Sequence, residues 1–133
     1  MFLGAAAGAA AKRELFVNQP YQPPASEPDR LRAQVALSLV AARTGVPPEA
    51  MTLPGRMRPA VCRARWLALY LAHVAYGWAL ERVSHAFAVN RTTAGKACRW
   101  AEDERDRPEV DRLLDELEGI TRQLFDTPRL DLA

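Results

Sequence analysis

The chain has 133 residues, of which 49% are hydrophobic and 26% are charged, a composition that supports one globular domain and excludes a disordered protein. The longest apolar run after the N-terminal leader, residues 66–80, is shorter than the ~20 residues that cross a bilayer, so we expect no membrane contact. The net charge is +2, but residues 54–100 carry eight Lys and Arg and one acid, whereas residues 101–133 carry five Arg and eleven acids. This asymmetry favours nucleic acid as a partner, although a solvated basic surface, or one paired with the acidic segment, would have the same composition.

Residues 1–28 are predicted to form a flexible, proline-rich N-terminal tail. A leader of small residues precedes a proline-rich segment that ends at Pro28, and no amphipathic period is present. Lys12 and Arg13 follow the apolar run of the leader, whereas a secretory signal needs basic residues before that run. We therefore expect a cytoplasmic protein.

Three helices are predicted after this tail. Asp29 can cap the first, which ends at Gly45, and Leu31, Val35, Leu39 and Ala42 fall on one face. A short second helix covers residues 47–51, where proline is tolerated in the first turn. A basic loop leads into a long third helix over about residues 60–76. Its predicted buried stripe comprises Val61, Ala64, Ala68, Leu71, Ala72 and Ala75.

Three more helices are predicted, over residues 79–87, from about Arg91 to about Arg105, and over residues 108–126, with a flexible tail at 127–133. Their expected inward faces are Leu80, Val83 and Phe87; Ala94, Ala97, Cys98 and Ala101; and Val110, Leu113, Leu114, Leu117, Ile120 and Leu124. The last helix is acidic, and a packing helix is favoured over a partner-binding or dimerising one. With no alternating run of strand length, the sequence predicts an all-α fold of about six helices.

The sequence contains little that indicates catalysis or metal binding. Cys62 and Cys98 lie far apart, which is typical of buried thiols, and no Cys/His cluster has metal-ligand spacing. His73 fits a core or rim position on a helix, and His85 a solvent-facing one. We expect no enzymatic activity, no metal and no cofactor.

The segment LERVSHAFAVNRTTAGKACRW has the layout of a helix-turn-helix at the centre of the fold. A small residue, Ala79 or Ser84, would let the two helices approach, while Phe87 and Val89 would fill the space beneath the turn. Asn90 stands where a helix N-cap is preferred. The start of the second helix would then enter the major groove of DNA.

The residues at this helix start suit DNA. Arg91 can donate two hydrogen bonds to guanine, and the methyl group of Thr93 suits thymine. The predicted major-groove set is Asn90, Arg91, Thr92, Thr93 and Lys96, and Arg99 lies further along the helix, toward the phosphate backbone. The alternative is a well-capped helix on a packed bundle, with Lys96 and Arg99 in solvent.

A second basic element is the stretch GRMRPAVCRARW. A basic loop that leads into a helix can place arginine in a narrow minor groove. We predict that Arg56, Arg58, Arg63 and Arg65, together with Arg99, contact the backbone or the minor groove. A solvated basic loop is the alternative.

These two elements, in this order, resemble the C-terminal DNA-binding domain (domain IV) of the bacterial replication initiator DnaA. RMRPAVCRARWLALYL is similar to its long helix, R-x-R-x-x-V-A-R-x-R-Q-x-A-M-x-L, and FAVNRTTAGKA to F-G-G-R-D-H-T-T-V-x-x-A, with a turn one residue shorter. QVALSLVAARTGVPPEAM is similar to the opening of that domain, so the resemblance covers about residues 30–105. It implies that Arg91 stands in place of a base-reading histidine, and that Arg63 and Arg65 stand where the family has its minor-groove and backbone arginines.

The phosphate-loop motif of the initiator's ATPase domain does not occur, so the chain resembles stand-alone, HdaB-type accessory proteins. The resemblance implies a domain IV-like unit at residues 29–107 and a nucleoid-associated protein that controls chromosome replication initiation. Its partner would be double-stranded DNA, including initiator-box-like sites, or DnaA and its regulators. Two alternatives stay open: a protein-interaction module that binds the initiator or a regulatory factor, and a helix-turn-helix transcriptional regulator.

Overall fold

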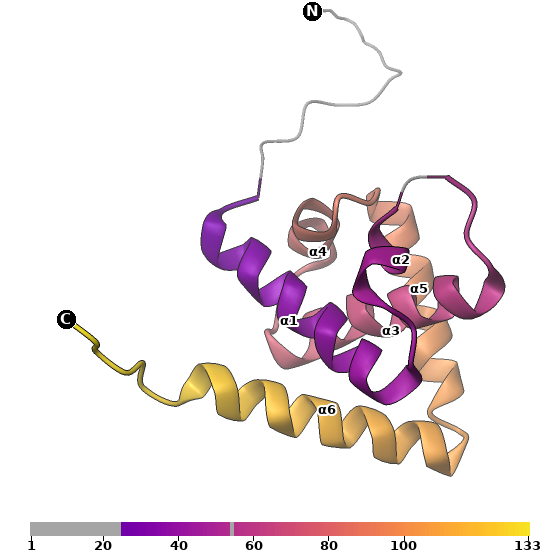
Figure 1. Ribbon diagram of the computed structural model, residues 1–133. Coiled ribbons are helices and arrows are strands. Elements are labelled where there is room, and N and C mark those ends of the chain that lie inside the picture. Colours follow the sequence, from indigo (N-terminus) through magenta and orange to yellow (C-terminus); the bar gives the residue numbers. More distant parts are fainter. Residues whose placement is uncertain (1–24, 54) are drawn as a thin grey trace, which may run out of the picture.

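Six helices and no strand make up residues 25–53 and 55–133, the part of the chain that the computed structural model describes (Figure 1). The predicted all-α chain of six helices is therefore confirmed over these residues. The helices are α1 (Glu27–Thr44), α2 (Pro48–Thr52), α3 (Pro59–Ala75), α4 (Leu80–Phe87), α5 (Arg91–Glu104) and α6 (Pro108–Asp126). No helix in the described ranges has the length and apolar character needed to cross a membrane.

The start of α1 differs from the prediction. Ser26, and not Asp29, is the N-cap, since its side-chain oxygen accepts a hydrogen bond from the Asp29 backbone N–H at 3.3 Å. The helix therefore begins at Glu27, inside the segment predicted as tail. The rest of that predicted tail, residues 1–24, lies outside the described residues.

Helix α3 is the centre of the fold and packs against α1, α5 and α6. The five residues from Leu67 to Leu71 are all buried, so this part of the helix is covered on every side. Ala64, Ala68 and Ala72 have small side chains, which allow the neighbouring helices to approach closely. The predicted stripe of α3 is confirmed at these alanines and at Leu71, whereas Val61 and Ala75 are only half-buried.

The predicted inward faces of α1 and α6 are partly wrong. Leu31 is 59% exposed and Leu124 is 56% exposed, and Ala42 and Ile120 are also exposed. The residues that α1 and α6 bury are Ala33, Ala36, Leu37 and Val40, and Leu114, Leu117 and Thr121. Leu114 and Leu117 belong to the predicted face of α6, whereas none of the buried residues of α1 belongs to its predicted face. At Ala33 and Ala36, alanine fits the close contact with α3 better than leucine would.

Thr121 explains why the buried face of α6 differs from the apolar pattern. Its hydroxyl donates a hydrogen bond to the Leu117 carbonyl oxygen at 2.7 Å, so the buried polar group is satisfied. A threonine can therefore take an inward position in place of Ile120.

The link between α3 and α4 turns the chain sharply. Gly77 has a φ of 69°, a left-handed conformation that glycine adopts at little cost. The next residue, Trp78, is buried, and its carbonyl oxygen lies 2.7 Å from Nδ1 of the half-buried His73. This contact confirms His73 at the rim of the core.

Candidate nucleic-acid interface

Helices α4 and α5 contact each other through small residues. Ser84 is fully buried, whereas Ala79 is exposed, so Ser84 is the small residue at this contact. Its hydroxyl donates to the Glu81 carbonyl oxygen at 2.6 Å, which satisfies the buried group. On α5, Ala94 and Gly95 are buried, and a Cβ atom on Gly95 would lie 3.8 Å from Leu80 of α4.

A short turn joins the two helices. Ala88 has φ 56° and ψ 43°, and this left-handed residue ends α4. The Val89 backbone N–H then donates to the Ser84 carbonyl oxygen at 3.0 Å. Val89 is buried and Phe87 is half-buried against both core clusters, as predicted for the residues beneath the turn.

Asn90 is the N-cap of α5, as predicted. Its side-chain oxygen accepts a hydrogen bond from the Thr93 backbone N–H at 2.7 Å. The cap occupies this oxygen, so the side-chain NH₂ group is the part of Asn90 that is free to donate to a ligand. The cap also fixes where α5 begins, and therefore which residues form its first turn.

The first turns of α5 present a basic surface. Arg91, Thr92, Lys96 and Arg99 are exposed, and Thr93 is half-buried. Thr92, Lys96 and Arg99 are spaced by four and three residues, so they lie on one face of the helix. Ala94, Ala97, Cys98 and Ala101 face the core, which confirms the predicted inward side of α5.

The basic element before α3 is exposed in most of its length. Arg56, Arg58 and Arg63 are exposed, and Arg58 is the N-cap residue of α3 without a side-chain cap bond. Arg65 is half-buried and lies 4.0 Å from the Met57 sulfur. Burial lowers the pKa of the Arg65 guanidinium.

The two predicted DNA elements lie on one side of the molecule. A groove with a volume of about 540 Å³ is lined by Gly55 and Arg65 from the basic element and by Ala86, Phe87 and Ala88 from the α4–α5 turn. Figure 1 shows the loop before α3 and the start of α5 in the same upper part of the fold, while α6 crosses the bottom.

Ion pairing divides the arginines of the chain into two groups. Of the eight Lys and Arg in residues 54–100, only Arg82 makes an ion pair, to Asp29, with an acid in the described part of the chain. In contrast, the first and last helices and the α5–α6 link use Arg30, Arg43, Arg105, Arg107 and Arg122 in ion pairs. The other seven basic side chains of this segment have no acidic partner among the residues that the structure describes.

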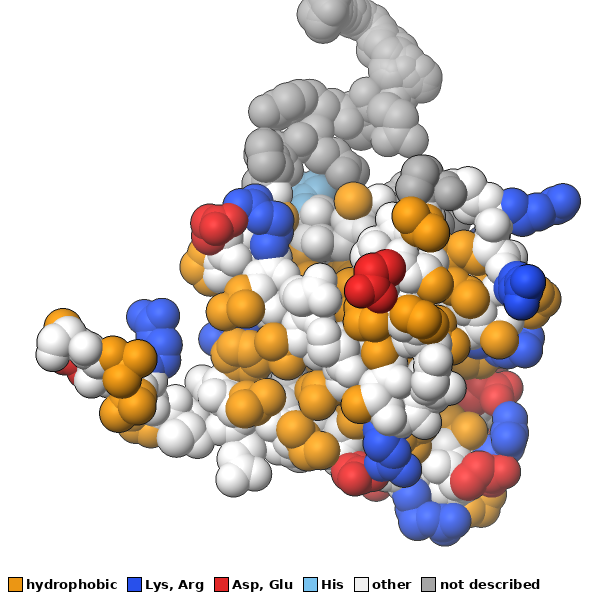
Figure 2. Space-filling model, in the orientation of Figure 1, with side chains coloured by type: hydrophobic (Ala, Val, Ile, Leu, Met, Phe, Trp, Pro, Cys, Tyr) orange, Lys and Arg blue, Asp and Glu red, His pale blue; other side chains and the backbone are white. Residues whose placement is uncertain are grey.

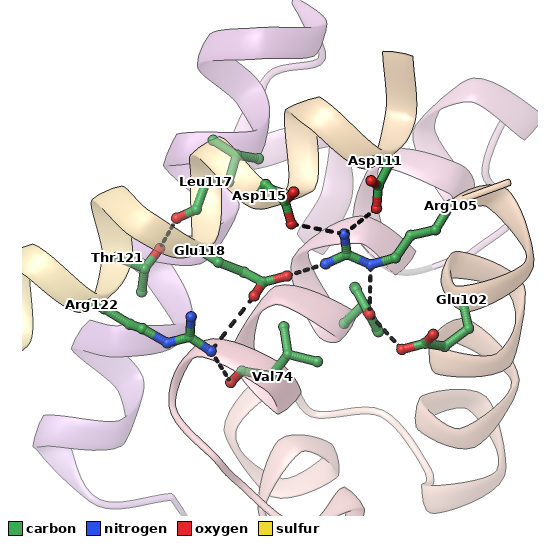
Figure 3. Close-up of polar contacts among 10 residues, drawn as sticks. Val74, Glu102, Arg105, Asp111, Asp115, Leu117, Glu118, Thr121 and Arg122 are labelled. Atoms are coloured by element: carbon green, nitrogen blue, oxygen red, sulfur yellow. Dashed lines mark hydrogen bonds and ion pairs between the residues drawn. The ribbon is translucent and has the colours of Figure 1, made fainter. Parts of the chain in front are cut away.

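Sequence reasoning missed the role of Arg105. Its guanidinium binds Asp111 at 2.7 Å, Asp115 at 3.1 Å and also Glu118 (Figure 3). A single side chain at the C-terminal end of α5 therefore pairs with three acids of α6. Burial disfavours its charge, but hydrogen bonds to Tyr70 and Asp111 raise the pKa of Arg105. The signal in the sequence was the spacing of the three acids, four and three residues apart on one helical face.

Tyr70 connects this cluster to α3. Its hydroxyl donates to the Glu102 carboxylate and accepts a hydrogen bond from Nε of Arg105 at 3.0 Å. Burial, followed by the contact with Glu102, raises the pKa of Tyr70 to about 12. Through Arg105 and Tyr70, three acids of α6 are thus linked to α3.

Other chemistry has little basis in the described residues. Among them, no group of three or more His, Cys, Asp or Glu side chains could hold a metal ion. Cys62 and Cys98 are both free; Cys98 is buried and Cys62 half-buried. Burial raises the pKa of the Cys98 thiol to about 11.

No protein-family model matches the chain, and no curated protein matches it at a significant level. The resemblance to the initiator domain therefore stays a prediction that depends on the residues quoted for it.

Proposed function

We propose that this protein binds double-stranded DNA through a helix-turn-helix formed by α4 and α5. The observation that carries the proposal is the exposed first turn of α5, with Arg91, Lys96 and Arg99 unpaired within the described part of the chain, beside a second unpaired basic element on the same side. Unpaired guanidinium and ammonium groups on one side of a protein suit the phosphates of a duplex.

In this proposal the two elements have different roles. The start of α5 lies in the major groove, where Arg91 donates to guanine N7 and O6, and Thr92 and Thr93 lie next to base edges. Arg56, Arg58 and Arg63 lie along the backbone or in the adjacent minor groove. The half-buried Arg65 has less freedom and would bind a phosphate from a fixed position.

The biological role follows from the resemblance to domain IV of DnaA. We propose an accessory protein that binds initiator-box-like sites and acts in the control of chromosome replication initiation. A protein-interaction module with the same fold, and a transcriptional regulator, are the competing functions. The unpaired basic side favours DNA over a protein partner bound through an apolar face.

Fluorescence anisotropy with the purified protein tests the proposal. The probes are an initiator-box duplex and a scrambled duplex, each titrated across a salt series from 50 to 200 mM. With about six phosphate contacts, the affinity should fall by roughly three orders of magnitude over this range. The variants are Arg91→Ala, Arg63→Ala and, as the control, Arg112→Ala, which removes an exposed arginine of α6.

The variants separate the two roles. Arg91→Ala should lose the preference for the box sequence, by about 1–3 kcal/mol of discrimination. Arg63→Ala should weaken binding to both duplexes equally and reduce the salt dependence of the affinity. Arg112→Ala should bind like the wild type. Equal binding of both duplexes by the wild type would remove the box-specific role. No binding to either duplex at 50 mM salt would refute DNA binding and favour the protein-interaction module.

A further inference from the structure

The groove between α1, α2 and the α4–α5 turn has an apolar floor, and we call it the turn groove. Leu37, Met51, Leu53 and Phe87 contribute to its lining, and Leu53 is 63% exposed. Two arginines, Arg30 and Arg65, also line it, and the described residues of its lining include no acid. The groove therefore combines apolar surface with positive charge.

The charge in the turn groove is concentrated at Arg65. Arg30 is paired with Glu27, but Arg65 has no acidic partner in the described part of the chain, and its side-chain hydrogen bond there is to the Met57 sulfur. A half-buried guanidinium of this kind favours an anionic ligand. A DNA phosphate would satisfy Arg65, yet it would leave the exposed Leu53 and the half-buried Phe87 open to water. The groove as a whole fits an apolar segment that carries a carboxylate.

Residues 130–132 of the C-terminal arm, which comprises residues 127–133, have this chemistry, and Arg129 precedes them. The arm follows α6 without helical structure and projects from the body of the molecule (Figure 1). Leu130 is 81% exposed and Leu132 is 87% exposed, and Asp131 lies between them. Figure 2 shows the arm with hydrophobic side chains at its end, separate from the main body. Two leucines this exposed on a short arm indicate a partner surface.

We propose that the C-terminal arm of one copy of this protein docks in the turn groove of a second copy. Leu130 and Leu132 contact the apolar lining of the groove, and Asp131, between them in the sequence, supplies the negative charge. Its carboxylate binds Arg65 of the second copy. The contact is head-to-tail, because arm and groove are different surfaces, so the arm of the second copy stays free for a third.

The docked arm occupies a groove that lies between the two DNA-binding elements. It therefore takes Arg65 away from a phosphate while leaving Arg91 and Lys96 exposed. The interface is small compared with the ~1,600 Å² of a stable complex, so we expect weak association in the range of tens to hundreds of micromolar. The association needs no DNA, so it is tested separately from the proposed function.

Sedimentation velocity of the full chain without DNA, over a concentration series, is the test. The wild type should show a weight-average sedimentation coefficient that rises with protein concentration. An arm variant, Leu130→Ser with Leu132→Ser, should stay monomeric, and so should a groove variant, Arg65→Glu. Leu53→Glu is a second groove variant at an exposed position, for which loss of folding is not expected.

Mixing provides the decisive measurement. The arm variant has an intact groove and the groove variant has an intact arm, so their mixture should form a one-to-one dimer that grows no further. Asp131→Arg combined with Arg65→Glu should restore self-association by exchanging the two charges. The control, Arg112→Glu, makes the same charge change as Arg65→Glu at an exposed position of α6 and should associate like the wild type.

Three outcomes would overturn the proposal. A wild type that is monomeric at every concentration would exclude the contact between copies. An arm that docks on its own molecule would give this same result. Loss of association in the Arg112→Glu control would place the interface on α6. A mixture of arm and groove variants that stays monomeric would exclude a head-to-tail contact.

Discussion

Ala88 has a backbone conformation that glycine tolerates better than alanine does. Its φ of 56° is the one positive φ of a non-glycine residue in the described ranges. The left-handed region costs an L-residue roughly 1–2 kcal/mol, and glycine avoids this cost. The greater freedom of glycine in the unfolded chain offsets part of the gain. We expect Ala88→Gly to raise the free energy of unfolding by about 0.5–1 kcal/mol in urea denaturation.

The matched control for this substitution is Ala42→Gly. Ala42 is an exposed residue inside α1, where glycine should lower the free energy of unfolding by about 0.5–1 kcal/mol. A loss of the same size in Ala88→Gly would show that the turn carries no strain.

Asp29 makes stability depend on pH. Its carboxylate accepts two hydrogen bonds from Arg82, both at 2.9 Å, and these contacts lower the pKa of Asp29. Because the folded pKa lies below the unfolded value, the stabilisation is present above about pH 4 and is lost as pH falls through the folded pKa. Asp29→Asn should cost roughly 0.5–1 kcal/mol at pH 7, since Arg82 is half-exposed, and almost nothing at pH 2.

Thermal unfolding monitored by circular dichroism at both pH values measures this difference. Asp126→Asn is the control, because Asp126 is exposed and makes no ion pair with another described residue. If Asp29→Asn were equally destabilising at pH 2 and pH 7, the effect would come from packing and not from the ion pair.

At the scale of the helices, Arg105 joins α5 to α6. Its side chain is 19% exposed and its three acidic partners are all on α6. Arg105→Ala removes several hydrogen bonds to charged groups and leaves Glu118, itself 13% exposed, with only its 3.5 Å contact to Arg122. We expect a loss of about 2 kcal/mol in the free energy of unfolding.

Arg107→Ala is the control for Arg105→Ala. Arg107 is 60% exposed and pairs with Glu104 and Glu109 at 3.2 Å, so its removal should lower the free energy of unfolding much less than the removal of Arg105 does. Equal effects of the two substitutions in urea denaturation would contradict a special role for Arg105.

The sequence predicted which segments are helical more reliably than which faces are buried. Helix ends were predictable because Asn90 and Gly45 act locally, through their own side chain or backbone. The buried faces of α1 and α6 were not, since alanine and threonine satisfy the same spacing as leucine and isoleucine. The choice between them depends on how closely α3 approaches, which local patterns do not encode.

The candidate site shows the same division. Exposure of Arg91 and Lys96 was predictable from the position of the cap. The groove between the basic loop and the α4–α5 turn was not, because its lining comes from four segments that are separate in the sequence. Arg105 was missed because its partners lie 6 to 13 residues away, across a turn.

At the scale of the whole molecule, two core clusters share two helices. The cluster with Leu71 and Leu114 and the cluster with Leu69 and Trp78 both include residues of α3 and α5. Neither cluster can be lost while the other stays intact. We therefore expect one cooperative unfolding transition for all six helices.

Two probes in urea test this cooperativity. Far-UV circular dichroism reports all helices, and Trp78 fluorescence, in a Trp66→Phe and Trp100→Phe background, reports the cluster beneath α4. The two midpoints should coincide. A separate, earlier transition of Trp78 would show that α4 and its turn unfold independently.

The ion pairs of Arg105 with three acids of α6 affect the position of the opposite end of α5. This helix is about 21 Å long, with its capped start on the basic side and its last turn fixed to α6. A tilt of a few degrees about the fixed end would displace the Arg91 end by about one to two ångströms, a distance comparable to the tolerance of a hydrogen bond to a base. Through Arg105, helix α6 therefore influences the position of Arg91 at the far end of α5.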